Sequence, residues 1–298
     1  MEYHMTETVP EILRILGQAD GRAMILAGGT DLMIDLEEGR KAASVLVDIT
    51  RTKELHGIRQ EDGELVIGGA ATLTEVSRSP LVRQYFPSLA RGAGVVGSLQ
   101  IRNLGTLAGN VITAQPAADG AMSLAPLAPV FVIESCTGTR RAGMEEMYAG
   151  FGKSSLDSSR ELVTQIRIPL PGETEAASFI RLELRRSLAL PMLNAAAMVK
   201  VDQGIVQWAR ITMGPVGVGP KRAYEAEKWL AGREFNSGNR KEAAGKVLLD
   251  ASPRSNPLRG SREYRMEVLP VLIERALEDI AQQLSLKAER RSGLWQNC

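Results

Sequence analysis

The sequence of 298 residues is poor in cysteine and histidine, the residues that most often form metal sites and hydrolytic centres. Its two cysteines are Cys136 and Cys298, and its two histidines are His4 and His56. A zinc site, a cysteine-held iron–sulfur cluster or a Ser-His-Asp triad needs more ligands or bases than these. We therefore expect no metal site and no catalytic side chain, so that any chemistry comes from a bound cofactor.

Charge and aromatic content exclude two further classes. Lys plus Arg (36) nearly balances Asp plus Glu (35), and aromatic residues make up 4% of the chain. Neither value suits a nucleic-acid or anionic-membrane surface. No apolar run is long enough to span a bilayer, and the acidic start lacks the apolar core of a secretory signal. The expected location is the cytoplasm, where a disulfide between the two cysteines is disfavoured.

The pattern of predicted elements indicates an α+β protein with two domains. A Pro- and Gly-containing stretch at 169–174 is the expected boundary, and beyond it strands are followed by helices rather than alternating with them. Cys136 is expected to be half-buried at the end of a strand. The predicted helices are 7–17, 31–38, one that the capping-box pattern of Thr72 and Glu75 opens, 81–97 with a break near Pro87, 222–231, 240–249 and 262–284. The predicted strands are 23–27, 44–49, 57–60, 64–68, 129–135, 139–143, 161–168, 177–184, 193–201 and 205–213.

A first glycine segment lies between a predicted strand and a predicted helix. Its residues are Ile25, Leu26, Ala27, Gly28, Gly29, Thr30, Asp31 and Leu32. Glycines let a ligand approach the backbone closely, and free N–H groups before a helix can hold a phosphate. The same residues suit a tight turn with Thr30 or Asp31 as the N-cap, and this segment alone does not separate the two interpretations. Asp31 is expected to face its own helix or hydroxyl groups of a ligand, because it would repel a phosphate.

A second glycine segment covers residues 97–110. Thr106, Gly109 and Asn110 supply a hydroxyl, a permissive backbone and an amide within a few residues, and Asp119 could accept hydrogen bonds from ribitol or ribose hydroxyls. Two such segments predict a large ligand with a diphosphate. The second segment therefore favours the ligand-binding interpretation of the first.

Other phosphate-binding motifs fit less well. Residues 92–97 match GxGxxG but follow a predicted helix, whereas a dinucleotide-binding motif follows a strand. Residues 152–154 resemble the end of a P-loop, but Met147 stands where its first glycine is required. The loop 214–220 is as well explained by a structural turn as by ligand contact.

With these two segments and Asp119, the sequence resembles the FAD-binding medium subunit of molybdenum hydroxylases, the family of xanthine, carbon monoxide and nicotinate dehydrogenases. The likeness extends over about residues 7–285 and includes 148–150, 161–169 and 178–182. It implies an α+β fold in which an FAD-binding domain of the vanillyl-alcohol-oxidase/PCMH type, with two α+β subdomains, precedes a smaller C-terminal α+β domain. The expected domains are 1–172 (subdomains about 1–56 and 57–172) and 173–287, with a tail at 288–298.

The resemblance also implies which residues contact FAD. Residues 27–31 and 106–110 would hold the diphosphate, and Gly97, Asp119 and Val163 match positions that line the cofactor. Leu107 matches the aliphatic residue expected against the isoalloxazine. Two positions depart from the family pattern: Ala108 replaces a glycine, and Arg181 replaces a lysine near the pyrimidine side of the flavin ring. Gly28→Asp or Gly109→Asp is expected to abolish FAD binding in a folded protein.

The function implied is electron transfer. FAD in this chain would take electrons from an iron–sulfur subunit with [2Fe–2S] clusters and pass them to NAD or another acceptor, while a large molybdopterin-binding subunit acts on the substrate. The expected assembly is a dimer of heterotrimers. A stand-alone flavin oxidoreductase and a non-catalytic nucleotide-binding regulator are the alternatives. The sequence does not indicate the substrate.

Overall fold

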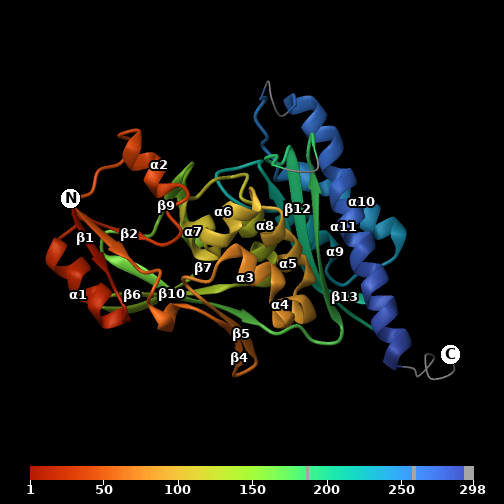
Figure 1. Cartoon of the computed structure of the whole chain (residues 1–298). Coiled ribbons are helices and arrows are strands. Elements are labelled where there is room, and N and C mark those ends of the chain that lie inside the picture. The colour runs from red at the N-terminus through yellow and green to blue at the C-terminus, as the bar shows by residue number, and fades with distance from the viewer. Residues whose placement is uncertain (186–187, 257–259, 292–298) are drawn as a thin grey trace.

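A computed structural model of the chain describes residues 1–185, 188–256 and 260–291. Within these residues the strands form a three-stranded, a five-stranded and a four-stranded sheet, in that order along the chain, and a small two-stranded one. The first sheet and the last helices lie at opposite ends of the molecule, with the helices that follow the β4–β5 hairpin between them (Figure 1).

The N-terminal sheet is parallel, with the strand order β1-β3-β2. Helix α1 covers it with the apolar face predicted from its spacing, since Ile12 and Leu16 are buried and Thr8 caps its first turn. The sequence pattern did not predict β1, because an exposed edge strand of four residues carries no apolar run. The elements are β1 (Glu2–Met5), α1 (Val9–Ala19), β2 (Ala23–Leu26), α2 (Leu32–Glu37) and β3 (Val45–Asp48).

The five-stranded sheet is antiparallel in the order β4-β5-β10-β6-β7, and short helices pack on it. The predicted break near Pro87 is confirmed, because Phe86 separates α4 from α5. Thr72 and Glu75 form the capping box of α3. The strands are β4 (Ile58–Glu61), β5 (Glu64–Gly68), β6 (Val130–Ser135), β7 (Gly138–Gly143) and β10 (Glu161–Pro169). The helices are α3 (Leu73–Arg78), α4 (Pro80–Tyr85), α5 (Pro87–Gly94), α6 (Leu99–Leu104), α7 (Leu107–Ile112) and α8 (Asp119–Leu124).

The C-terminal sheet is antiparallel in the order β11-β12-β13-β14, and α11 covers one of its faces. The opposite face packs on α5 and α8, so that residues 193–199 of β12 are buried on both sides and are apolar apart from Asn194. The strands are β11 (Glu175–Leu182), β12 (Leu193–Asp202), β13 (Ile205–Gly214) and β14 (Lys221–Arg222), and the helices are α9 (Tyr224–Leu230), α10 (Ser237–Lys246) and α11 (Arg262–Arg291). The small sheet pairs β8 (Tyr148–Gly150) with β9 (Lys153–Ser154).

Aligned rows of side chains make the contact between the C-terminal sheet and the preceding domain. In the strand register Phe179, Ala196 and Thr212 lie side by side, and Arg181, Asn194 and Gly214 form the next row. Phe179 and Ala196 pack against Met122 of α8, and all three are essentially inaccessible to solvent. The second row therefore lies close to the start of α8.

Several expectations at the ends of elements need correction. Helix α11 was predicted to end at Leu284, yet it continues to Arg291 and includes part of the predicted tail. Cys136 is exposed, not half-buried, because β6 ends one residue before it. Cys298 and the rest of the tail from residue 292 lie outside the described residues. Within the described part of the chain, no helix is long and apolar enough to cross a membrane.

Phe179→Ala tests the contact between the two domains. Removing a fully buried phenyl group leaves a cavity, so the free energy of unfolding should fall by about 3–5 kcal/mol. The measurement is urea unfolding followed by tryptophan fluorescence, with Leu249→Ala as the control, because Leu249 is 71% exposed. Equal unfolding midpoints for the two variants would contradict this packing.

Candidate functional site

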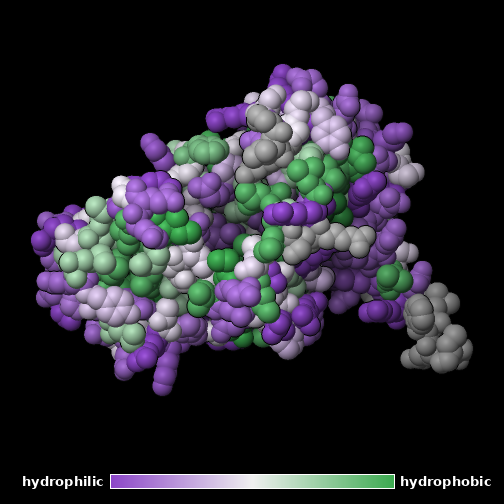
Figure 2. All heavy atoms as spheres, turned by 45° about the horizontal axis from the view of Figure 1, so that its top comes forward, coloured by the Kyte–Doolittle hydropathy of each residue, from purple (hydrophilic) through white to green (hydrophobic). Residues whose placement is uncertain are grey.

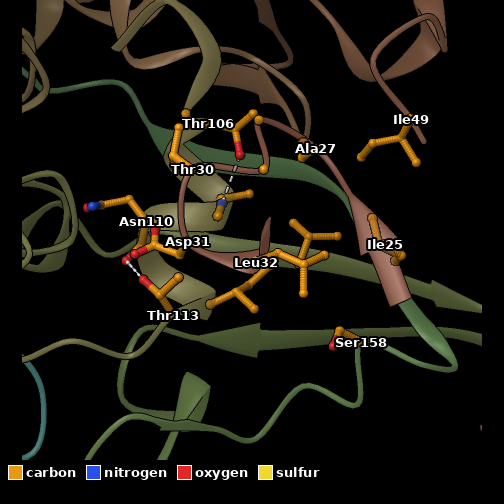
Figure 3. Close-up of a pocket in the computed structure, with 18 of the residues that line it drawn as sticks. Ile25, Ala27, Thr30, Asp31, Leu32, Ile49, Thr106, Asn110, Thr113 and Ser158 are labelled. Carbon is orange, nitrogen blue, oxygen red and sulfur yellow. Dashed lines mark hydrogen bonds between the residues drawn. The ribbon is translucent and has the colours of Figure 1, made fainter. Parts of the chain in front are cut away.

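The two glycine segments meet around a cavity of about 220 Å³, called the smaller cavity below. Figure 3 shows Thr30 and Asp31 of the first segment beside Thr106 and Asn110 of the second. Most of the residues predicted from the two segments line this cavity. They are Ile25, Ala27, Gly28, Gly29, Thr30, Asp31, Leu32, Thr106, Ala108, Gly109 and Asn110, together with Val163 from β10.

The first glycine segment turns from β2 into α2 at Gly29, whose φ of +66° is a left-handed conformation that favours glycine. Within the described residues, the backbone N–H groups of residues 28–31 donate no hydrogen bond to the protein. Four adjacent unpaired donors at a cavity surface are suited to an anion with several oxygens.

Asp31 occupies the N-cap position of α2, but its side chain makes no capping hydrogen bond. Its carboxyl is at the cavity surface, where burial and the neighbouring Asp35 raise its pKa and Lys41 lowers it. Because the side chain does not serve its own helix, the remaining expectation for Asp31 is contact with ligand hydroxyls.

The second glycine segment is more regular than a glycine-rich loop. Residues 97–110 contain α6 and the start of α7, separated by Gly105 and Thr106. Thr106 caps α7, since its Oγ1 accepts a hydrogen bond of 3.0 Å from the Gly109 amide, and the Asn110 Oδ1 accepts one of 3.0 Å from the Ala121 amide. Both side chains therefore fix the backbone that faces the smaller cavity.

Gly28 is required for contact between the two segments. A Cβ at residue 28 would lie 2.0 Å from the Leu104 carbonyl oxygen, a backbone atom of the second segment. A side chain at residue 28 would therefore first separate the two segments, so Gly28→Asp is expected to disturb the fold as well as FAD binding. At Gly109 a Cβ would meet the Thr106 Oγ1 at 2.8 Å, a contact with a side-chain atom.

A larger cavity of about 860 Å³ continues from the smaller one towards the C-terminal domain. The two share Thr30, Asp31, Val96, Ile101, Asn110 and Thr113. Gly97 and Asp119 line the larger cavity, and its far wall consists of residues 215–218 and 252–256. In the space-filling view this part of the molecule is hollowed between the N-terminal and C-terminal lobes (Figure 2).

Asp119 is a buried carboxyl in the wall of the larger cavity. It is 5% exposed, accepts a hydrogen bond of 2.9 Å from the Asn194 Nδ2, and lies 3.4 Å from the Arg181 Nε. Burial raises the pKa of Asp119 to about 6, although Arg181 and Asn194 oppose the shift. This carboxyl can therefore change its charge near neutral pH.

Three of the residues expected at the cofactor do not line either cavity: Leu26, Leu107 and Arg181. Leu107, in the first turn of α7, is fully buried in the apolar core that also contains residues of the five-stranded sheet and of α8. The structure also adds residues that the sequence patterns did not indicate, among them Lys41, Leu156 and Ser158, and it places residues 215–218 of the loop 214–220, which was left open between a turn and ligand contact, in the wall of the larger cavity. Lys41 has no motif around it, and the others reach the cavities only through tertiary packing.

The comparisons with known proteins identify the family. Residues 1–171 match the model for the FAD binding domain in molybdopterin dehydrogenase, and residues 179–280 match the CO dehydrogenase flavoprotein C-terminal domain. The chain therefore belongs to the FAD-binding medium subunits of molybdenum hydroxylases. These subunits are flavoprotein components of heteromeric oxidoreductases, and the resemblance seen in the sequence is confirmed.

Similar proteins cover almost the whole chain. The nicotinate dehydrogenase FAD-subunit of Eubacterium barkeri is 33% identical over 95% of this chain and 97% of its own length. A putative xanthine dehydrogenase FAD-binding subunit of Escherichia coli K12 is 28% identical over 93% of this chain and 94% of its own length. A chain of carbon monoxide dehydrogenase from Hydrogenophaga pseudoflava superposes with a TM-score of 0.88 at 27% identity, over 95% of this chain and 98% of that one. The predicted fold, an FAD-binding α+β domain followed by a C-terminal α+β domain, is confirmed.

The residues present fit FAD. The smaller cavity offers unpaired amides for a diphosphate and the apolar side chains of Ile25 and Ile49, and the larger cavity leaves room for a ring system. Ala108, the position at which the resemblance implies a glycine, is 3% exposed and belongs to the apolar core as well as to the cavity lining.

Gly28→Ala should destabilise the protein even without FAD. The added methyl cannot be accommodated unless the Leu104 backbone moves, so the free energy of unfolding should fall by about 1–3 kcal/mol. Urea unfolding of the FAD-free chain measures this, with Gly245→Ala as the control, because a Cβ there has no neighbour within 4 Å. If Gly28→Ala unfolded like this control, the contact between the segments would be refuted.

The ionisation of Asp119 should appear in the pH dependence of stability. Its folded-state pKa of about 6 exceeds an unfolded value near 4, so its contribution is complete below about pH 4 and is lost as the pH rises through about 6. Relative to the wild type, Asp119→Asn should gain about 2–3 kcal/mol in free energy of unfolding over that range. Urea unfolding of both FAD-free proteins at several pH values tests this, and a pH-independent difference would contradict it.

Proposed function

We propose that one FAD molecule spans both cavities and carries electrons from an iron–sulfur partner subunit to NAD or another acceptor. The observation that supports this most is the row of unpaired amides at residues 28–31, all at the smaller cavity, of which Thr30 and Asp31 line both cavities. These donors suit the diphosphate at the centre of a dinucleotide, with its two ends directed into different cavities.

The smaller cavity would hold the diphosphate and the adenosine end. The amides of residues 27–31 and 106–110 would approach the phosphate oxygens, and Asp31 would accept hydrogen bonds from hydroxyl groups. Lys41 is the cation in this lining, and its Nζ lies 3.0 Å from Asp35. A negatively charged ligand would be repelled by the carboxylates of Asp31 and Asp35. Lys41 is the residue whose positive charge would offset this repulsion.

The larger cavity would hold the flavin ring. When bound, FAD supplies the redox chemistry, because it exchanges electrons singly with metal clusters and singly or in pairs with other acceptors. The protein orients the ring and sets its electrostatic surroundings, for which Asp119 is the ionisable group in the wall. No acid or base from this chain is required for electron transfer.

Membership of the family supports our proposal for the remaining parts of the complex. An iron–sulfur subunit with [2Fe–2S] clusters and a large subunit with the molybdopterin cofactor would complete the enzyme, as a dimer of heterotrimers in the cytoplasm. The substrate would be selected in the large subunit, as the varied names of the relatives suggest, including nicotinate and xanthine dehydrogenases. Within this chain we propose residues 1–172, with subdomains meeting near 56, as the FAD-binding domain and 173–287 as the C-terminal domain.

Gly109→Asp tests where the diphosphate binds. The new carboxylate would lie at the cavity surface beside Thr106, so FAD affinity should fall at least about 100-fold through repulsion and lost space. FAD titration followed by flavin fluorescence gives the dissociation constant, and circular dichroism checks the fold. The control is Gly245→Asp on α10, which should bind FAD as the wild type does.

A wild-type chain that binds no FAD, or a Gly109→Asp variant with unchanged affinity, would contradict the proposal. Copurification of the native protein then separates the subunit from a stand-alone flavin oxidoreductase. The proposed subunit is recovered with cysteine-rich and molybdopterin-binding chains, whereas the stand-alone enzyme is recovered alone and reduces an acceptor directly.

A further inference from the structure

Arg181, Asp119 and Asn194 form a buried polar cluster where the C-terminal sheet meets α8. Asn194 is fully buried, and its Nδ2 donates to the Asp119 Oδ1, while the Arg181 Nε lies 3.4 Å from the other carboxylate oxygen. Arg181 and Asn194 are paired residues of β11 and β12. The carboxyl of one domain is therefore held by two neighbouring strands of the other.

The remaining contacts of Arg181 also lead to the wall of the larger cavity. Its Nη1 donates to the Val95 carbonyl oxygen at 3.2 Å, and its Nη2 donates to the carbonyl oxygen of Ala189. Ala189 itself lines the larger cavity, as do the two residues that follow Val95. The guanidinium thus joins three parts of one wall, yet the side chain is 8% exposed and does not line the cavity.

We propose that Arg181 is a positioning residue for the flavin ring, which fixes the Asp119 carboxyl and the backbone at residues 95 and 189 without contacting the ring itself. This inference rests on the proposed placement of the ring in the larger cavity. It differs from the direct role that the family likeness implies for this position.

The geometry explains why arginine suits this position. A guanidinium presents several donors in a rigid plane, so it can reach both carbonyl oxygens and face a carboxylate at the same time. A lysine ammonium is a single compact charge on a flexible stem. Arg181→Lys should therefore keep the positive charge beside Asp119 but lose hydrogen bonds to the Val95 and Ala189 carbonyl oxygens, which hold the cavity wall.

The arrangement also affects the ionisation of Asp119. The charged groups facing Asp119 are Arg181 and Glu183, whose Oε2 lies 3.1 Å from the Arg181 Nε, and the polar neighbour is Asn194. Arg181 opposes the rise in the pKa of Asp119 that burial causes. Removing the cation should move this pKa higher, whereas a lysine should leave it near its original value.

The experiment uses the full FAD-loaded chain and two readouts. One is the dissociation constant of FAD, and the other is the visible absorption of the bound flavin against pH, which should show a transition as Asp119 ionises. The variants are Arg181→Met, Arg181→Lys and Asp119→Asn. Arg14→Met is the control, because Arg14 is exposed on α1 and, within the part of the chain that the structure describes, donates a hydrogen bond only to Gln18.

Arg181→Met should weaken FAD binding about tenfold and raise the midpoint of the pH transition. Arg181→Lys should also weaken binding but keep the midpoint, and Asp119→Asn should abolish the transition. In the double variant Arg181→Met/Asp119→Asn, the loss of affinity should be smaller than the product of the two single losses, because Arg181 acts partly through Asp119.

Two results would overturn the inference while leaving FAD binding intact. One is an Arg181→Met variant that matches Arg14→Met in both readouts, and the other is a double variant whose losses multiply fully, as expected for a separate contact with the ring. If Arg181→Met does not fold, Arg181→Lys and Asp119→Asn decide, and an unchanged FAD affinity in Arg181→Lys refutes the positioning role. A wild-type chain without FAD affinity refutes the proposed function instead.

Discussion

The close approach of two backbone segments is the constraint on which the cofactor site depends. Gly28 lies so near the Leu104 carbonyl that no side chain fits between them, and this contact closes one side of the smaller cavity. Within the described residues, the amides of residues 28–31 in the first segment donate no hydrogen bond to the protein. The proposed phosphate-binding surface would therefore depend on packing between segments about eighty residues apart.

A second constraint acts at the other end of the site. Both faces of β12 are buried, and Asn194 is the polar residue on the face that meets α8. A buried amide and a buried guanidinium need partners, and Asp119 supplies one for both. The electrostatics of the larger cavity therefore depend on how the C-terminal sheet docks, which links the second domain to the proposed flavin environment.

Much of the fold and part of the site could be predicted from the sequence. The apolar spacing of α1, the capping box of α3 and the break before Pro87 are local signals, and the structure confirms them. The glycine segments also marked most of the residues that line the smaller cavity. Edge strand β1 escaped prediction because its stability comes from pairing with β3, which lies about forty residues away.

The positions of Leu107, Lys41 and Arg181 could not be predicted for the same reason. Leu107 faces the core because Thr106 starts a helix there, and Arg181 turns away from the larger cavity because Asp119 and two carbonyl groups attract it. Such orientations depend on tertiary neighbours and leave no local pattern. Sequence likeness can indicate that a residue belongs to a site, whereas its role there depends on what lies between it and the ligand.

An experimental structure of the FAD-loaded chain would test most directly whether the two glycine segments hold the cofactor. We expect the diphosphate within hydrogen-bonding distance of the amides of residues 28–31, the ring in the larger cavity beside Asp119, and Arg181 behind that wall. A diphosphate bound elsewhere, with those amides paired to protein groups, would contradict this expectation.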